Sequence, residues 1–346
     1  MMNEWMIPSM VFVVSMLGTG WLAVFLRRRG QVDVPNERSS HRVPTPRGGG
    51  LAVIFALVLG FEVTRFVDQL PFDGFFYVAL ALVSLMGYLD DKYRLSPMLR
   101  LVIYFSAAAI ITFSRSWIDL IPLPPPFNLD WGWWRYPMSM IWIVGVLNLT
   151  NFLDGIDGYL GVQTVIVGLG LCLLFQTETA LQIGMILIAA ALGFLVHNWH
   201  PAKIFLGDVG SVSLGFIFAV TPFYLGGGPI EYRVFLVGML LWFFLSDGTF
   251  TIVRRLIAGE KIWNPHHKHL YQRLTEVGWS HRRIVAVVLA MQVTVLVSLQ
   301  HFAARPGFGQ WWVVALVFVL FGCYFGLVLA VEARHKRHKK AGDSGS

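Results

Sequence analysis

The sequence predicts an all-α polytopic integral membrane protein with about 11 transmembrane helices. Of its 346 residues, 56% are hydrophobic and only 14% are charged, and the mean hydropathy is +0.62. Apolar runs approaching the roughly 20 residues that a helix needs to cross the hydrocarbon core recur along nearly the whole chain. Because soluble domains are rarely so apolar, we predict a single transmembrane domain over residues 1–346.

The apolar runs define the expected helices in chain order. They lie at residues 5–26, 48–66, 75–89, 98–113, 137–150, 159–176, 180–196, 211–225, 233–250, 284–302 and 311–330. The first run continues into Arg27-Arg28-Arg29 without a small-residue cleavage site, so we interpret it as a retained helix rather than a signal peptide. Residues 331–346 are expected to form a basic, disordered cytoplasmic tail.

Lys and Arg residues divide unevenly between alternate connections. Five segments hold 22 of the 27, namely 27–47, 90–100, 197–210, 251–283 and 331–346. The positive-inside rule makes these segments cytoplasmic and the amino terminus external. The net charge of +7 therefore fits topology and attraction to anionic membrane lipid, and we expect no nucleic-acid partner.

The first polar motif is the adjacent pair Asp90-Asp91 at the inner end of an apolar run. Carboxylates at a membrane boundary are costly without a cation partner, and Lys92 and Arg94 follow directly. A simple helix-end charge cluster is the structural alternative.

The second motif opens the next cytoplasmic connection, where hydrophobicity stops abruptly. The spacing of Asn148, Asn151 and Asp154 places them on one face of a helix. Asp157 follows, with glycines at 155 and 158 that allow a ligand to approach the backbone. The motif therefore predicts a polar binding site at the inner end of this helix.

Two further motifs lie in later cytoplasmic segments. Phe205-Leu206-Gly207-Asp208 precedes an apolar run, which sets a carboxylate beside helix amino-terminal amides and suits a metal-bound phosphate; an ordinary helix cap is the alternative. The segment 264–269 carries three histidines, yet it lacks the Cys or acidic partners of a zinc site. Binding of phosphate and sugar hydroxyls suits it better.

Together these loops gather hard oxygen ligands and cations on one membrane face. Carboxylate and amide oxygens favour Mg²⁺, with Mn²⁺ as an alternative, and Mg²⁺ is typically shared with substrate phosphates. The four motifs therefore point to pyrophosphate chemistry at the cytoplasmic surface.

In this order, the motifs resemble those of the polyprenyl-phosphate N-acetylhexosamine-1-phosphate transferase family (glycosyltransferase family 4). The similarity is carried by Asp33-x-Pro35, Ser40-His41, Pro44-Thr45-Pro46-Arg47-Gly48-Gly49-Gly50, Asp90-Asp91, the 148–158 motif, Phe205-x-Gly207-Asp208-x-Gly210-Ser211 and the 266–269 histidines. Several such motifs together are far more specific than any one. The span number, the external amino terminus and the Pro-Thr-Pro-Arg-Gly-Gly loop resemble the O-antigen and common-antigen initiating branch more than the peptidoglycan branch.

The resemblance implies a single transmembrane transferase domain in the bacterial inner membrane. Its expected reaction moves an N-acetylhexosamine-1-phosphate from a UDP-sugar to undecaprenyl phosphate and releases UMP at the cytoplasmic face. That step would initiate synthesis of O-antigen, lipopolysaccharide or a related cell-envelope polysaccharide. A homodimer is left open.

The resemblance also implies roles for individual residues. Asp208, and second Asn151, would hold Mg²⁺, with Asp91 as a contributor; Asp90 and Asp91 are the catalytic candidates, Asp90 orienting or deprotonating the lipid phosphate. The expected nucleotide-binding residues are Asn148, Asp154, Asp157 and Phe205, the last stacking on uracil. The expected phosphate- and sugar-binding residues are Arg47, Arg94, Arg100, His266, His267 and His269.

Two alternatives stay open at this point. The fourth motif reads His-His-Lys-His rather than the His-x-His-His typical of the branch that uses UDP-N-acetylglucosamine, so a 6-deoxy donor carrying N-acetylfucosamine or N-acetylquinovosamine is an alternative sugar. The other alternative is a membrane transporter using intramembrane carboxylates, which the scarcity of mid-span acids disfavours.

Overall fold

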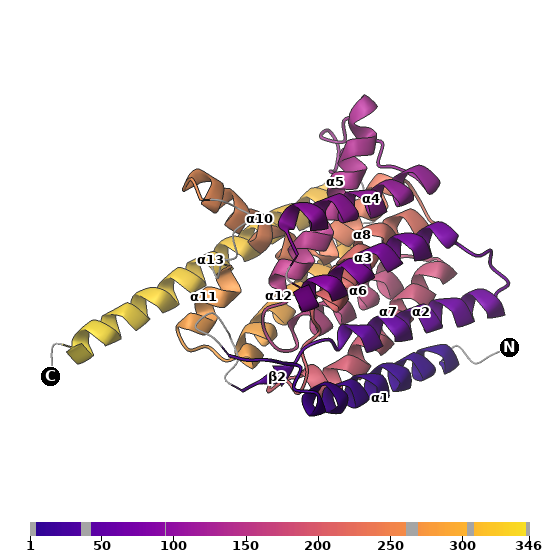
Figure 1. Ribbon diagram of the computed structural model, residues 1–346. Helices are drawn as coiled ribbons and strands as arrows, with labels where there is room; N and C mark the ends of the chain where they lie inside the picture. Colours follow the sequence, from indigo (N-terminus) through magenta and orange to yellow (C-terminus); the bar gives the residue numbers. More distant parts are fainter. Residues whose placement is uncertain (1–4, 36–42, 94, 261–268, 303–307, 344–346) are drawn as a thin grey trace.

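The computed structural model describes residues 5–35, 43–93, 95–260, 269–302 and 308–343 as a bundle of helices with one very small sheet (Figure 1). The helices are α1 (Met6–Arg28), α2 (Gly50–Val67), α3 (Gly74–Tyr93), α4 (Pro97–Ser114), α5 (Arg135–Leu153), α6 (Tyr159–Leu174), α7 (Glu178–Asn198), α8 (Asp208–Tyr224), α9 (Ile230–Leu240), α10 (Trp242–Ile257), α11 (Leu270–Glu276), α12 (His281–Phe302) and α13 (Phe308–Asp343), with a short 3₁₀ turn η1 (Gly132–Trp134). The predicted all-α class is confirmed.

The apolar helices have the lengths of a polytopic membrane protein. Among the described residues, eight are long and apolar enough to cross a membrane, or nine if the bent pair α9–α10 is one span. The helices α6 and α8 are apolar but shorter. The count of 11 spans therefore stays a prediction, whereas the multi-pass character is clear.

One predicted helix, 233–250, is wrong as a single straight span. The chain breaks between Leu240 and Trp242, and the axes of α9 and α10 differ by 79°. The break falls inside the continuous apolar run 234–245, ahead of the first charged residue of α10, Asp247, so composition does not mark it. Periodicity alone did not separate the two pieces.

The helix α8 forms the centre of the bundle. Every residue from Val209 to Phe223 is buried, which is expected of a helix that is apolar all round. The first turn of α8 touches α3 closely, since a Cβ added at Gly87 would lie 2.7 Å from the Asp208 carbonyl oxygen. The central helix thus carries Asp208 to the end of the bundle where α3 also ends.

The segment between α1 and α2 folds back over that same end. The strands β1 (Val32–Asp33) and β2 (Thr45–Pro46) pair antiparallel, with Val32 opposite Pro46. Directly after β2, Arg47 forms a parallel bridge with Phe205. This end holds the Lys- and Arg-rich connections and is therefore the predicted cytoplasmic one.

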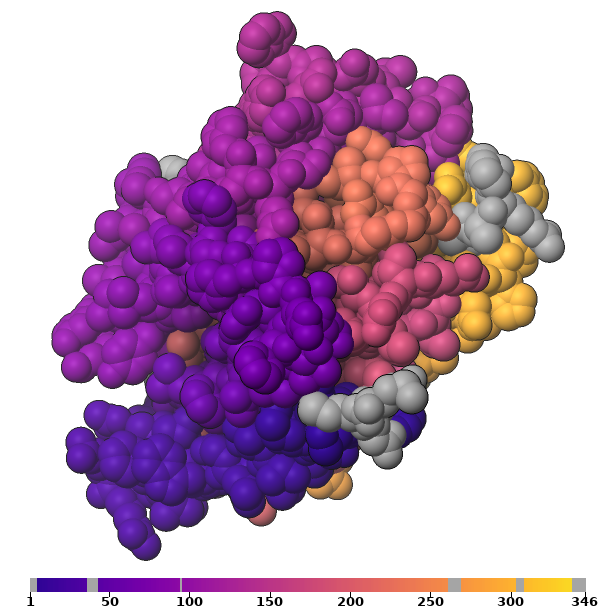
Figure 2. Space-filling model, turned by 90° about the vertical axis from the view of Figure 1, so that its right-hand side faces the viewer, coloured from indigo at the N-terminus to yellow at the C-terminus, as the bar shows by residue number. Residues whose placement is uncertain are grey.

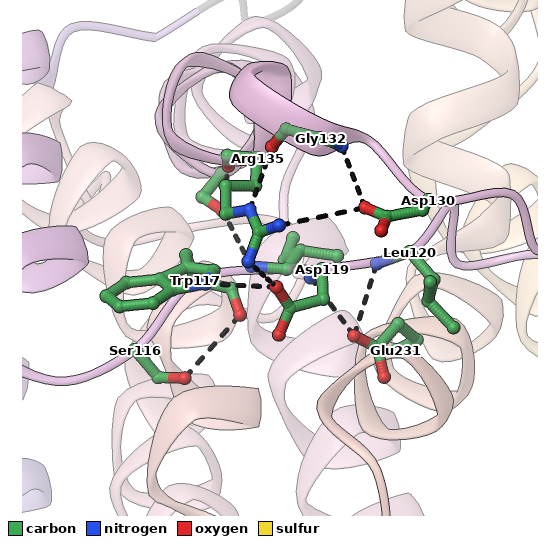
Figure 3. Close-up of polar contacts among 10 residues, drawn as sticks. Ser116, Trp117, Asp119, Leu120, Asp130, Gly132, Arg135 and Glu231 are labelled. Atoms are coloured by element: carbon green, nitrogen blue, oxygen red, sulfur yellow. Dashed lines mark hydrogen bonds and ion pairs between the residues drawn. The ribbon is translucent and has the colours of Figure 1, made fainter.

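The opposite end faces the viewer in Figure 2, where the folded connection 115–134 lies along the upper part of the molecule. Glu231 accepts hydrogen bonds from the Asp119 and Leu120 amides at 3.0 and 3.3 Å. Arg135 donates to Asp119 at 2.5 Å and to the Gly132 carbonyl at 2.8 Å (Figure 3). Because Glu231 belongs to α9, these bonds tie the connection to the bundle.

The carboxyl-terminal tail departs from the expectation of disorder. The helix α13 continues to Asp343 and projects beyond the other helices (Figure 1). The backbone hydrogen bonds of a helix are made within the helix itself. The helix of the apolar span therefore continues into the basic segment, which was expected to be irregular.

Candidate active site

A cleft of about 840 Å³ opens at the predicted cytoplasmic end of the bundle. Its lining comes from the ends of α1, α2, α3, α4 and α8 and from the segments between α1 and α2 and between α3 and α4. The charged lining residues are Asp33, Arg47, Asp90, Asp91, Lys92, Arg100 and Asp208. The structure therefore brings the first and third sequence motifs together, with Arg47 between them.

Backbone hydrogen bonds place Arg47 beside α8. The Gly48 and Gly49 amides donate to the Phe205 carbonyl at 3.1 and 2.9 Å, and the Phe205 amide donates to the Pro46 carbonyl at 2.8 Å. These bonds fix the backbone on both sides of Arg47. The Pro-Arg-Gly-Gly loop is thus a positioning element for one guanidinium group.

Asp91 caps the first turn of α8. Its two carboxylate oxygens accept hydrogen bonds from the amides of Asp208 at 3.0 Å and Val209 at 3.1 Å. A carboxylate is well suited to this place because it pairs with unsatisfied amides and with the positive end of the helix dipole. The catalytic candidate Asp91 therefore also has a structural role.

Arg47 bridges the two acidic side chains at this helix end. Its Nε lies 2.7 Å from Asp91 Oδ1, and its Nη2 contacts Asp208 Oδ1. Burial by itself lowers the pKa of Arg47, but the carboxylates of Asp208 and Asp91 raise it above its ordinary value. The guanidinium is therefore firmly cationic.

Asp90 points to a different neighbour from Asp91. Its Oδ1 accepts from the Leu95 amide and its Oδ2 from Arg100, both at 2.7 Å. Its side chain is 8% exposed. Charge-assisted bonds at both oxygens hold this carboxylate in a fixed orientation at the wall of the cleft.

The chemistry of the donor set fits a hard divalent cation. Asp208 is flanked by two further carboxylates and keeps a partly exposed side chain, at 19%. Asn151, on the last turn of α5, is half-buried and makes no side-chain hydrogen bond with other described residues, but it is not among the residues that line the cleft. Carboxylate and amide oxygens of this kind are Mg²⁺ ligands.

Asp154 extends the acidic site towards α5. It lies directly after that helix, and desolvation raises the pKa of its carboxyl to about 7. Arg47 opposes this rise, whereas the charges of Asp208 and Asp91 add to it. The pKa of Asp154 thus depends on the charges of Arg47, Asp208 and Asp91, which meet at the cleft.

Asp157 is engaged by two histidines. Its Oδ2 lies 2.6 Å from His200 Nδ1 and 3.3 Å from His281 Nδ1, and it accepts from the Ala202 amide at 3.1 Å. Burial alone raises the pKa of Asp157, but the hydrogen bonds from these histidines and Ala202 lower it below its ordinary value. The three side chains have ligand atoms within 4.8 Å of one another, yet Oδ2 is already satisfied without a metal.

The remaining predicted residues occupy varied positions. Asn148 donates back to the Val144 carbonyl within α5, and Phe205 is half-buried beside the cleft loop. His269, at the start of α11, is 2% exposed, and its Nδ1 lies 3.6 Å from Asp247 Oδ1 of α10. It is not among the residues that line the 840 Å³ cleft. Arg94, His266 and His267 lie outside the described residues.

Comparison with known proteins places the chain in a family. The family model for glycosyl transferase family 4 matches residues 74–226. A probable undecaprenyl-phosphate N-acetylglucosaminyl 1-phosphate transferase of Bacillus subtilis is 32% identical, with 83% of each chain covered. The chain belongs to glycosyl transferase family 4.

Two further relatives of this chain have related names. A decaprenyl-phosphate N-acetylglucosaminephosphotransferase of Mycobacterium tuberculosis is 30% identical over 80% of this chain and 76% of its own. The undecaprenyl-phosphate alpha-N-acetylglucosaminyl 1-phosphate transferase of Escherichia coli K12 is 23% identical over 90% of this chain and 86% of its own. The resemblance inferred from the motifs is thus confirmed at the level of the family.

The family 4 match runs from α3 to the end of α8 and so includes Asp90, Asp91 and Asp208. Arg47 lies outside it, although the structure puts Arg47 between two of these carboxylates. Sequence reasoning missed this bridge and the pairing of Asp157 with His200 and His281. The signal for His200 was present, since it directly precedes the Pro201-Ala202-Lys203 stretch of the third motif.

Proposed function

We propose that the protein transfers an N-acetylhexosamine-1-phosphate from a UDP-sugar to undecaprenyl phosphate and releases UMP at the cytoplasmic face of the bacterial inner membrane. The observation that carries this proposal is the meeting of Asp91, Asp208 and Arg47 in one cleft, with Asp90 and Arg100 on its wall. The names of the family 4 relatives support a polyprenyl-phosphate acceptor and an N-acetylglucosamine donor. Initiation of O-antigen or a related cell-envelope polysaccharide is the pathway role that we propose for this step.

The cleft suits a reaction between two phosphates. Arg47, Lys92 and Arg100 contribute cations to its lining, and guanidinium groups bind phosphate oxygens in pairs. Mg²⁺ held by Asp208 and Asn151 would neutralise the donor diphosphate and help to align an in-line attack. Since like-charged phosphates repel, this neutralisation is the main task of the site.

Asp90 is best suited to orienting the acceptor side. Arg100 donates to one of its oxygens and the Leu95 amide to the other. A carboxylate held in this way fixes the Arg100 guanidinium at the wall of the cleft, where that cation can receive the phosphate of the lipid. We therefore favour orientation over proton abstraction for Asp90.

The lipid acceptor is supported by the apolar part of the lining. Leu26, Leu51 and Leu95 border the same cleft as the charged groups, and Leu51 is 41% exposed. An acceptor with a charged head and an apolar tail needs both kinds of surface, since its tail stays in the hydrocarbon. A soluble nucleotide-sugar, by contrast, needs only a polar surface.

The transporter alternative finds less support. An ion path would set carboxylates along the membrane interior, whereas Asp90, Asp91 and Asp208 gather at one end of the bundle. Asp247 is fully buried and is held by Thr251 and the Leu270 amide. That carboxylate serves the packing of α10 against α11.

A lipid-dependent transfer assay tests the proposal. Purified protein would be incubated with undecaprenyl phosphate, Mg²⁺ and a panel of UDP-N-acetylhexosamines while UMP release is measured. We expect UMP release that requires the lipid, is fastest with one donor and stops on chelation of the metal. Absence of lipid-dependent UMP with every donor would refute the transferase function.

A pair of matched variants tests the metal assignment. Asp208→Asn should abolish turnover because it removes the main anionic ligand. Asp73→Asn is the control, since Asp73 also lies at the start of a helix and has a similarly shielded side chain, 15% against 19% exposed, but is at the opposite end of the bundle. Wild-type turnover in Asp208→Asn would remove Asp208 from the metal site.

A further inference from the structure

Arg47 lies against two carboxylates for which a cation at this site would compete. It contacts Oδ1 of both Asp91 and Asp208, and Asp90 lies close enough to Asp208 to interact with it. Three carboxylates this close repel one another unless positive charge lies between them. The guanidinium supplies that charge in the structure as it stands.

The surroundings of Arg47 hold its backbone in place but leave its side chain free to move away from the two carboxylates. The Gly48 and Gly49 amides anchor the loop on Phe205, so the position of the Arg47 Cα is fixed. The side chain itself is 41% exposed and borders the 840 Å³ cleft. A long flexible side chain on a rigid backbone can therefore swing from the carboxylates into the cleft.

A divalent cation and a guanidinium compete for the same position. Both are positive and both would draw on the Asp208 carboxylate, so the approach of one disfavours the other. The donor diphosphate carries the opposite charge and offers oxygen pairs that suit a guanidinium. Binding of metal and donor together would thus free Arg47 and give it a new partner.

We propose that Arg47 is a displaceable cation, which holds Asp91 and Asp208 together in the metal-free site and moves to the donor phosphates when the metal binds. This inference rests on the proposed function for the identity of the metal and the donor. It assigns Arg47 two successive partners. It also explains why the loop anchors the backbone of Arg47 and leaves its side chain half-exposed.

The proposal predicts opposite effects on metal binding and on turnover. In Arg47→Ala, the dissociation constant for Mn²⁺ should fall about tenfold, because a charge-assisted competitor is gone. UMP release should fall as well, because the donor phosphates lose a cation. A purely structural role would weaken metal binding, and a role in phosphate binding alone would leave it unchanged.

The experiment measures Mn²⁺ binding by electron paramagnetic resonance on purified full-length protein, without donor or lipid. Arg115→Ala is the matched control. Arg115 also pairs with an aspartate through Nε and Nη2, and its side chain is 40% exposed, but it lies at the other end of the bundle. Its dissociation constant for Mn²⁺ should equal that of the wild type.

Guanidinium ion provides a second measurement. Adding a few millimolar guanidinium should raise the Mn²⁺ dissociation constant of Arg47→Ala towards the wild-type value. The same addition should leave the dissociation constant of the wild type unchanged. If Arg47→Ala does not fold, Arg47→Lys should still lower the constant, since an ammonium cannot bridge two carboxylates as a planar guanidinium does.

The outcomes separate this inference from the proposed function. Mn²⁺ binding that is lost in Asp208→Asn but equal or weaker in the Arg47 variants would overturn the displacement of Arg47 alone. An absence of Mn²⁺ binding to the wild type would overturn the metal assignment and this inference with it. Tighter binding in Arg47→Ala that added guanidinium fails to weaken would also contradict a competing cation.

Discussion

The contact between α2 and α8 gives the sharpest prediction of how the site is positioned. Gly50 begins α2, and a Cβ added there would lie 2.4 Å from both the Cα and the amide nitrogen of Gly210. These partners are backbone atoms, which cannot rotate away. Ordinary contact begins at 3.4 Å, so Gly50→Ala must separate the two helices locally by about 1 Å.

That displacement acts directly on the cleft. Arg47 lies three residues before Gly50, and Asp208 lies two residues before Gly210, so separating the helices draws the guanidinium away from the carboxylate. Misplacement of reacting groups by about 1 Å costs on the order of 100-fold in rate, equivalent to about 3 kcal/mol of barrier. Overpacking should also lower the free energy of unfolding by roughly 1–3 kcal/mol.

Initial rates of UMP release and thermal unfolding in detergent measure the two effects. Gly145→Ala is the control, because an added Cβ at that position of α5 meets nothing within 4 Å and alanine favours the helix by about 1 kcal/mol. We expect Gly145→Ala to keep its rate and to keep or slightly raise its melting temperature. If Gly50→Ala behaves like this control, the close contact does not position the site.

Three further substitutions test other parts of the structure. Asp91→Asn should lower the melting temperature, because the cap on the first turn of α8 loses its charge at a cost of about 1–2 kcal/mol; an unchanged melting temperature would contradict the capping role. Asp157→Asn should be less stable than the wild type at pH 7. Because folding lowers the pKa of Asp157, this carboxylate stabilises the fold above its unfolded pKa of about 4 and the difference should shrink as the pH falls below that value; a difference constant down to pH 3 would argue against the pairing. Glu231→Ala should speed amide hydrogen exchange in the connection 115–134 while UMP release stays at the wild-type rate, and unchanged exchange would show that the bonds of Glu231 do not hold that connection.

The gathering of the acidic motifs was predictable because the inner ends of the apolar runs must meet at one membrane face. The division of labour inside the Asp90-Asp91 pair was not. Consecutive helix residues point about 100° apart, so Asp90 turns to Leu95 and Arg100 whereas Asp91 reaches the first turn of α8. The partner of Asp91 is 117 residues away, and local spacing contains no information about such a contact.

The second motif also shows that local spacing does not determine which side chains meet. The helical spacing of Asn148, Asn151 and Asp154 predicts that all three lie on one helix face, yet α5 ends at Leu153 and Asp154 lies beyond it. The position of a helix end depends on the neighbouring chain, which periodicity does not report. The bend after Leu240 has the same origin, since α10 packs against α11 through Asp247 and the Leu270 amide.

The amino-terminal end of α8 explains why this site needs cations from other segments of the chain. A free helix amino terminus binds phosphate through its amides and its dipole, but here Asp91 takes the Asp208 and Val209 amides. Two carboxylates thus stand where an anion would otherwise bind, and they repel a diphosphate. On the proposed function, a donor diphosphate at this helix end would need cations, and those among the described residues that line the cleft are Arg47, Lys92 and Arg100, to which the proposed metal would add its charge. Because the two carboxylates repel a diphosphate until a cation lies between them, we predict that the donor binds only after the metal.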